Sequence, residues 1–92
     1  MQVSVNLGTV INVRNYGLVK AIGDKIRETR LAKDLSQEQL SYDSDLPLSQ
    51  IGRIERGENN PTISSLYAIA KALNVDLKLL VDVSFTEKVK KR

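Results

Sequence analysis

The chain has 92 residues, of which 41% are hydrophobic, so it has the length and apolar content of one small folded domain. It contains no cysteine and no histidine, which excludes disulfides, thiolate or imidazole catalysis and most zinc sites. We therefore expect no enzyme activity, no metal and no cofactor. The net charge is +3, but the last six residues, EKVKKR, account for all of it, so the bulk charge does not identify a partner.

The sequence lacks the signals of membrane and secreted proteins. No apolar run approaches the roughly 20 residues that a helix needs to span a bilayer. The first residues also lack the basic start and apolar stretch of a secretory signal. We therefore expect a cytoplasmic protein.

Both ends of the chain carry β-prone stretches. Residues 2–7, QVSVNL, alternate polar and apolar side chains, and VINV follows after a Gly8-Thr9 break. Near the other end, Val81, Val83 and Phe85 alternate with polar residues. We expect an N-terminal arm over residues 1–17 and a strand-like segment with a basic tail over residues 82–92. These arms either pair, within one chain or between two, or remain frayed ends.

Helical periodicity begins after the first arm and continues over residues 18–81. A first helix is expected over residues 19–34. Its inner face carries Val19, Ile22, Ile26 and Arg30. Ser36 begins a capping box, in which its hydroxyl accepts from the Gln39 amide while the Gln39 side chain reaches back. This box predicts a short second helix from residue 37 to about residue 43.

Three more helices are expected further along the chain. The third begins at residue 47 or 48 and ends at residue 56, with Gly57 as its stop. Thr62 is a suitable N-cap for a fourth helix. The inner side of that helix carries Ile63, Leu66, Ile69, Ala70 and Leu73. Asn74 suits a left-handed cap, and Asp76 can cap a short last helix. The sequence thus predicts an all-α bundle of five helices.

The third helix has two unlike faces. On a helical wheel, Ile51 and Ile54 point to one side. Ser49, Arg53 and Arg56 gather on the opposite side. We therefore expect one face to pack on the core and the other to present a hydroxyl and two guanidinium groups to solvent.

Glu55 lies at the margin of the buried face, within about 40° of Ile51 on the wheel. A carboxylate there is costly unless it has a charged, hydrogen-bonding partner. Arg30 holds the equivalent position on the first helix, four residues after Ile26. We predict that Arg30 and Glu55 pair and tie the first helix to the third.

The second and third helices are separated by a tight turn, an arrangement typical of a helix-turn-helix unit. Ser41 is small enough to let the two backbones approach. Asp45 tolerates the positive φ that such a turn needs, though less readily than glycine. The polar side of the third helix then stays exposed.

The segments IRETR, LSQEQL, IGRIERGENNPT and LYAIAKALNV resemble the phage-repressor type of helix-turn-helix domain. This is the family of the lambda and 434 repressors, Cro and the xenobiotic-response-element regulators, and the resemblance extends from Ile22 to about Leu80. It implies a five-helix, repressor-like bundle that binds double-stranded operator DNA, usually as a homodimer. It also implies a sequence-specific transcriptional regulator whose recognition helix, about residues 48–56, enters the major groove.

The resemblance implies three groups of site residues. The positions that face bases in the family are Leu48, Ser49, Gly52 and Arg53. Those that contact phosphates are Gln37, Arg56, Asn59, Asn60 and Thr62. Arg30 and Glu55 match the internal ion pair of the family, which agrees with the wheel.

The chain departs from the family pattern at three positions. Ser41 stands where alanine is usual, and Asp45 where glycine is usual. Gly52 replaces a longer polar side chain, so direct readout would rest on Arg53, bidentate to a guanine, with Ser49 assisting. Such limited readout implies modest specificity for each half-site, which a dimer would sharpen; the terminal strands offer one way to form it.

Two functions remain compatible with these observations. The favoured one is a transcriptional regulator, which should bind its own promoter. The alternative is an antitoxin or another partner-binding regulatory protein of the same fold, whose arms would bind a second protein.

Overall fold

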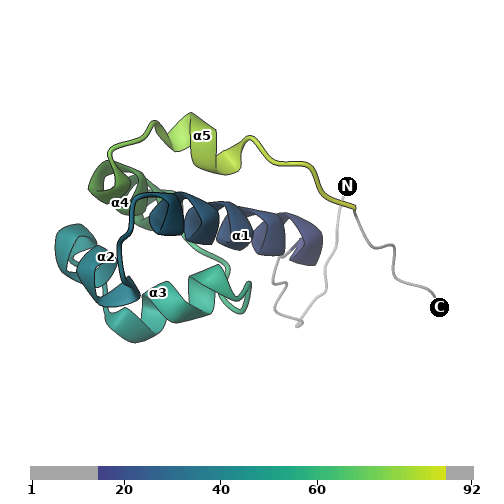
Figure 1. Cartoon of the computed structure of the whole chain (residues 1–92). Helices are drawn as coiled ribbons and strands as arrows, with labels where there is room; N and C mark the ends of the chain where they lie inside the picture. Colours follow the sequence, from purple (N-terminus) through teal and green to yellow (C-terminus); the bar gives the residue numbers. More distant parts are fainter. Residues whose placement is uncertain (1–14, 87–92) are drawn as a thin grey trace.

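The computed structural model describes residues 15–86 of the chain, and these form five helices in sequence. The helices are α1 (Tyr16–Ala32), α2 (Gln37–Ser44), α3 (Leu48–Glu55), α4 (Ile63–Leu73) and α5 (Leu77–Val81). In Figure 1, α1 crosses the middle of the molecule, with α5 on one side and α3 on the other. The predicted all-α bundle of five helices is confirmed.

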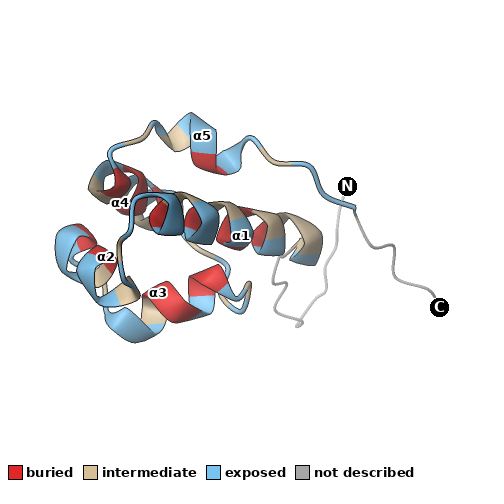
Figure 2. Cartoon of the chain, in the orientation of Figure 1, coloured by how far each residue is buried: buried red, intermediate tan, exposed pale blue. Residues whose placement is uncertain are grey.

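Aliphatic side chains from all five helices form one core. Its buried members are Ile22, Ile26, Leu40, Ile51, Ile54, Leu66, Ile69, Ala70, Leu73 and Leu80. Figure 2 shows the buried positions turned inward, toward the space that the helices share. Burial of each larger side chain contributes about 1.5–3 kcal/mol, so the core supplies most of the stabilisation. The prediction that Ile63 lies on the inner side of its helix is wrong. Ile63 begins α4, and its side chain is 68% exposed, beyond the edge of the core.

The first helix begins three residues earlier than the periodicity predicts. Asn15 is its N-cap, and the Asn15 side-chain oxygen accepts a hydrogen bond from the Leu18 amide at 2.9 Å. This cap satisfies one of the amides that a helix leaves without a partner at its start. The helix ends at Ala32, and Asp34 follows in a left-handed turn with φ of 59°. Residues 15–17, predicted as part of an arm, therefore belong to the cap and the first turn of α1.

The caps of the shorter helices follow the predicted chemistry with one exception. The Ser36 hydroxyl accepts from the Gln39 amide at 3.0 Å, as the capping box requires. The Gln39 side chain, however, donates to the Asp43 carboxylate one turn on, rather than reaching back. Thr62 caps α4 with its side chain, and Asn74 ends it in the left-handed conformation. Asp76 holds the N-cap position of α5 but makes no side-chain capping bond.

The described residues do not support strand-like arms. Residues 82–86 form no strand, and residues 1–14 and 87–92 lie outside the part that is described. Of the alternating apolar residues near the C-terminus, Val83 packs against the core, and the segment that follows crosses the start of α1. That crossing is close: a Cβ placed on Gly17 would lie 2.5 Å from the Thr86 carbonyl oxygen.

Candidate nucleic-acid interface

A buried ion pair joins α1 to α3. The Arg30 guanidinium donates from Nε to Glu55 Oε2 at 2.7 Å and from Nη2 to Glu55 Oε1 at 2.9 Å. The two side chains are 7% and 1% exposed, so the pair is shielded from water. The hydrogen bond to Glu55 is the main reason that the pKa of Arg30 is raised above its ordinary value. The structure thus contains the ion pair that the helical wheel predicts, and this pair fixes α3 on the body of the domain.

Two further hydrogen bonds complete this buried cluster. A third nitrogen of Arg30, Nη1, donates to the Leu35 carbonyl at 2.7 Å and so fixes the connection between α1 and α2. Gln37 Nε2 donates to Glu55 Oε1 at 3.0 Å. The sequence did not predict the second bond, because the position of the half-buried Gln37 side chain depends on how α2 packs over α3. It joins the first residue of α2 to the same carboxylate that holds α1.

The backbones of α1 and α3 touch at Gly23. A Cβ on Gly23 would lie 2.3 Å from the Ile54 carbonyl oxygen and 2.8 Å from that of Glu55. Any larger residue would therefore push α3 away from α1. This contact was not predicted from the sequence, although a glycine inside a helical pattern is the signal that could have revealed it.

The turn between α2 and α3 has the geometry that the sequence predicts. Asp45 ends α2 in the left-handed conformation, with φ of 62° and ψ of 30°. Ser41 does more than allow a close approach, since its hydroxyl donates to the Leu46 carbonyl at 2.6 Å. Serine therefore fastens the turn at a position where the family usually has alanine.

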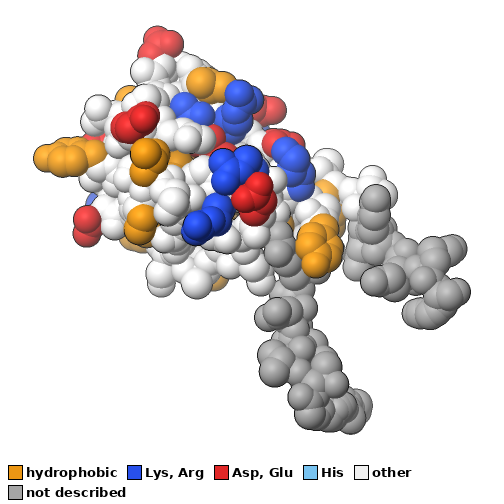
Figure 3. All heavy atoms as spheres, turned by 90° about the horizontal axis from the view of Figure 1, so that it is seen from below, with side chains coloured by type: hydrophobic (Ala, Val, Ile, Leu, Met, Phe, Trp, Pro, Cys, Tyr) orange, Lys and Arg blue, Asp and Glu red, His pale blue; other side chains and the backbone are white. Residues whose placement is uncertain are grey.

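The outer face of α3 carries most of the residues expected to face bases. Leu48, Ser49, Arg53 and Arg56 are exposed, whereas Gly52 is buried. A Cβ on Gly52 would lie 3.0 Å from Arg56 Nη1, which shows that the guanidinium of Arg56 folds back over the glycine. Figure 3 looks at the molecule from below, and Lys and Arg side chains gather in the middle of this view, with acidic side chains among them.

The connection from α3 to α4 contains the other predicted contact residues. Asn60 and Thr62 are exposed, and Asn59 is half-buried. The Thr62 hydroxyl accepts from the Ser65 amide at 3.0 Å, and Gln50 of α3 donates to the Ser65 hydroxyl at 3.3 Å. The start of α4 is thus tied to α3, a link that the sequence did not reveal.

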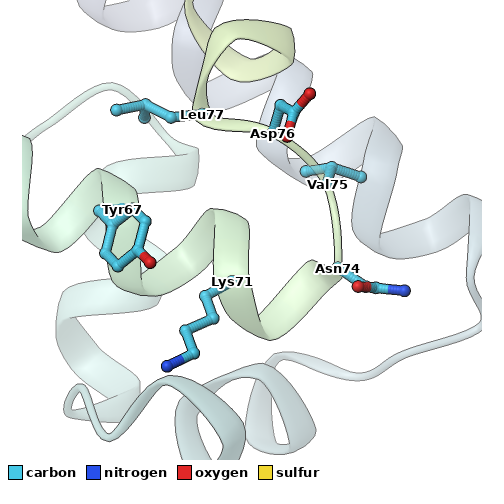
Figure 4. A pocket seen from close by; sticks show the side chains of 6 residues that line it. All are labelled: Tyr67, Lys71, Asn74, Val75, Asp76 and Leu77. Atoms are coloured by element: carbon cyan, nitrogen blue, oxygen red, sulfur yellow. The ribbon is translucent and has the colours of Figure 1, made fainter.

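Several hollows of the described residues lie away from the predicted site residues. A shallow hollow of about 420 Å³ lies at the turn between α4 and α5. Its polar side chains diverge, with Asp76 and Asn74 pointing away from Lys71 (Figure 4). It contains none of the predicted site residues. Within residues 15–86, no three potential metal ligands gather, and no helix has the length and apolar character to cross a bilayer.

Comparison with known proteins gives consistent similarities. The helix-turn-helix family model matches residues 26–80. The control protein C.BamHI of Bacillus amyloliquefaciens is 43% identical over 61 residues, which are 65% of this chain and 75% of that protein. The restriction-modification controller protein C.AhdI from Aeromonas hydrophila superposes with a TM-score of 0.65 at 41% identity, covering 68% of this chain and 94% of that one. The controller protein C.Esp1396I, solved as a tetramer with its natural 35 base-pair operator, gives a TM-score of 0.65 at 38% identity and covers 68% of this chain and 83% of that one.

Proposed function

The chain belongs to the helix-turn-helix family, and we propose that it regulates transcription as a homodimer that inserts α3 into the major groove of operator DNA. The observation that carries this proposal is the division of α3 into two faces. Ile51 and Ile54 are buried, while Arg53 and Arg56 face solvent. The major groove of B-DNA admits one α-helix, so a helix held in this way can meet base edges and phosphates together.

Base recognition rests mainly on Arg53. Its guanidinium can donate two hydrogen bonds to a guanine, the commonest specific contact in the major groove. Ser49 lies one turn earlier on the same face and can assist, and Leu48, 42% exposed, can contact a thymine methyl. Gly52 has no side chain and is buried, so it contributes room for the neighbouring arginines rather than a contact.

Phosphate contacts position the helix. Gln37 begins α2, where free backbone amides favour an anion. Arg56 is the C-cap of α3, and Asn59, Asn60 and Thr62 follow in the connection to α4. Phosphate contacts at the start of α2 and after the end of α3 would help to fix the angle of α3 in the groove, as backbone contacts do in other DNA-binding proteins.

A second copy of the chain is the partner that best fits α5 and the residues after it. Leu79, Val81 and Phe85 are 41%, 40% and 43% exposed, an apolar surface that we call the α5 surface. It lies on the other side of α1 from α3 (Figure 1), so a contact there leaves α3 uncovered. A two-fold dimer would present its two recognition helices about 34 Å apart, in successive major grooves. The assembly of C.Esp1396I on its operator as a tetramer supports self-association.

The antitoxin alternative has less support. The similar proteins reported above are controller proteins, and C.Esp1396I was solved on operator DNA. A regulator of this class works where the DNA is, which favours the cytoplasm. A copurifying toxin would reverse this preference.

The proposed function is tested by selecting bound sites from random duplex DNA with the full chain. We expect enrichment of two symmetric half-sites whose centres lie about one helical turn apart. Arg53→Ala should cost about 1–3 kcal/mol and relax the preference at one base pair of each half-site. Arg27→Ala, which removes an exposed arginine from α1, is the matched control and should leave the selected motif unchanged. Failure to enrich any motif, or equal weakening of all sequences by Arg53→Ala, would contradict base reading.

A further inference from the structure

Arg56, a predicted phosphate contact, is already engaged by a carboxylate of its own chain. Its Nε donates to Glu58 Oε2 at 2.9 Å, and its Nη2 donates to Glu58 Oε1 at 3.1 Å. The side chains are 58% and 53% exposed, so this pair lies on the surface. The fork of the guanidinium is therefore occupied by a two-oxygen anion in the free protein.

The pair lies within the face proposed to meet DNA. The Arg56 guanidinium folds over Gly52, where an added Cβ would lie 3.0 Å from Nη1 and 3.8 Å from Gln37 Oε1. Glu58 is also bound to α3 through its backbone, because its amide donates to the Arg53 carbonyl at 2.8 Å. The acidic group thus stands beside the residues proposed to read bases and to hold phosphates.

The charge of Glu58 is stabilised in this position. The hydrogen bond from Arg56 lowers the pKa of the Glu58 carboxyl below its ordinary value, and the positive charges of Arg56 and Arg53 act in the same direction. The group is consequently a full negative charge at neutral pH. A negative charge on this face repels the phosphates that the arginines attract.

A carboxylate and a phosphate bind an arginine side chain in the same geometry. Both present two oxygens that match two parallel N–H groups of the guanidinium. The Nε and Nη2 edge of Arg56 can hold one such anion at a time. We propose that Glu58 is an internal competitor for DNA: it occupies the phosphate-binding edge of Arg56 in the free protein and must turn away when DNA binds. This inference rests on the proposed function, to which it adds Glu58 as a residue that limits the affinity for DNA.

Competition of this kind lowers the affinity for specific and for non-specific DNA by the same factor. Non-specific binding depends almost entirely on phosphate contacts, whereas specific binding adds contacts to base edges. Displacement of Glu58 costs the same at every site, so it lowers the absolute affinity of both kinds of complex and leaves the ratio between them unchanged. The specific complexes still bind because their base contacts offset this cost.

The test measures duplex binding by fluorescence anisotropy for the full chain, with the selected operator and with a scrambled duplex. We expect Glu58→Gln to tighten binding to both duplexes by about two- to tenfold at 0.1 M salt. This range is typical of an exposed ion pair whose carboxylate also repels phosphate. The slope of log affinity against log salt should become steeper by up to about one. Since Glu58 is exposed, circular dichroism should report an unchanged fold.

Two controls separate competition from a simple change of charge. Glu28→Gln removes the same charge from α1, beside residues 82–84, and should leave affinity nearly unchanged. In an Arg56→Ala background, Glu58→Gln should lose most of its effect, because there is no guanidinium left to release. A gain that persists in full without Arg56, or that equals the effect of Glu28→Gln, would overturn the proposal. If the wild-type chain bound neither duplex, the proposed function itself would fail.

Discussion

At the scale of single residues, the buried cluster around Glu55 shows what a wheel can and cannot reveal. Both Arg30 and Glu55 stand four residues after a buried isoleucine, so their pairing follows from spacing and from the cost of an isolated buried charge. The hydrogen bond from Gln37 could not be deduced in this way, because it depends on the angle at which α2 crosses α3. Periodicity locates a residue on its own helix but does not determine that angle.

The ion pair gives a prediction about stability. Glu55→Gln leaves the guanidinium of Arg30 buried without a compensating charge, which should cost about 3–5 kcal/mol in the free energy of unfolding measured with urea. Asp24→Asn is the control, since it breaks the exposed pair with Lys20 and should cost about 1 kcal/mol or less. A double substitution, Arg30→Met with Glu55→Leu, should recover much of the loss. Equal losses for Glu55→Gln and Asp24→Asn would contradict the structural role of the pair.

The pH dependence of this pair follows from the raised pKa of Arg30. A raised pKa in the folded state gives a stabilisation that is fully present below the unfolded value and lost as pH rises through the folded value. The ordinary pKa of arginine is far above neutrality. The Arg30 side chain should therefore make no contribution to changes of stability near pH 7.

At the scale of helices, the elements followed from local signals, whereas of the contacts between helices the sequence predicted the Arg30–Glu55 pair but not the bonds of Gln37 and Gln50. The caps at Ser36 and Thr62 and the left-handed ends at Asp45 and Asn74 have signatures within a few residues. The start of α1 was missed, since Asn15 follows a β-prone stretch and is followed by a glycine within two residues, and both features suggested that the arm continued to residue 17. The close approach of the α1 and α3 backbones is a property of two helices, and its only mark in the sequence is Gly23.

Two buried glycines allow that contact to be tested. Gly23→Ala places a Cβ against the backbone of α3, which cannot move aside, and should destabilise the domain by about 1–3 kcal/mol despite the better helix propensity of alanine. Gly52→Ala meets the ends of the Arg56 and Gln37 side chains, which can turn aside, and should leave stability unchanged or slightly higher. Thermal unfolding of both variants is the measurement. A Gly23→Ala variant as stable as the wild type would show that the two backbones are not in close contact.

At the scale of the whole molecule, a small domain must bury enough surface to be stable and still present surface to partners. The core occupies the space between α1 and the other helices, and two opposite sides remain available: α3 with its arginines, and α5 with its exposed aliphatic side chains. The helical wheel of α3 predicted the exposed face that carries the arginines. The sequence suggested terminal strands for self-association, whereas residues 82–86 contain no strand.

The α5 surface leads to a prediction about assembly. Leu79→Glu puts a charge into a contact that we propose to be apolar, and it should weaken dimerisation by about 2 kcal/mol without unfolding the chain, since Leu79 is 41% exposed. Native mass spectrometry over a range of concentrations would measure the shift to monomer. Tyr42→Glu on α2 is a control for added charge at an apolar site, because Tyr42 is 84% exposed and lies outside the α5 surface. A dimer that is unaffected by Leu79→Glu would place the interface elsewhere.

In the proposed function, the outer face of α3 is the surface that contacts DNA. The most direct measurement is a titration of the ¹⁵N-labelled chain with the selected duplex, followed by amide NMR shifts along residues 15–86. We expect shifts concentrated in the first residues of α2, in residues 48–56 and in residues 58–62, with α5 unchanged or affected only through self-association. Shifts that leave α3 unchanged and concentrate on α4 and α5 would contradict the proposed function.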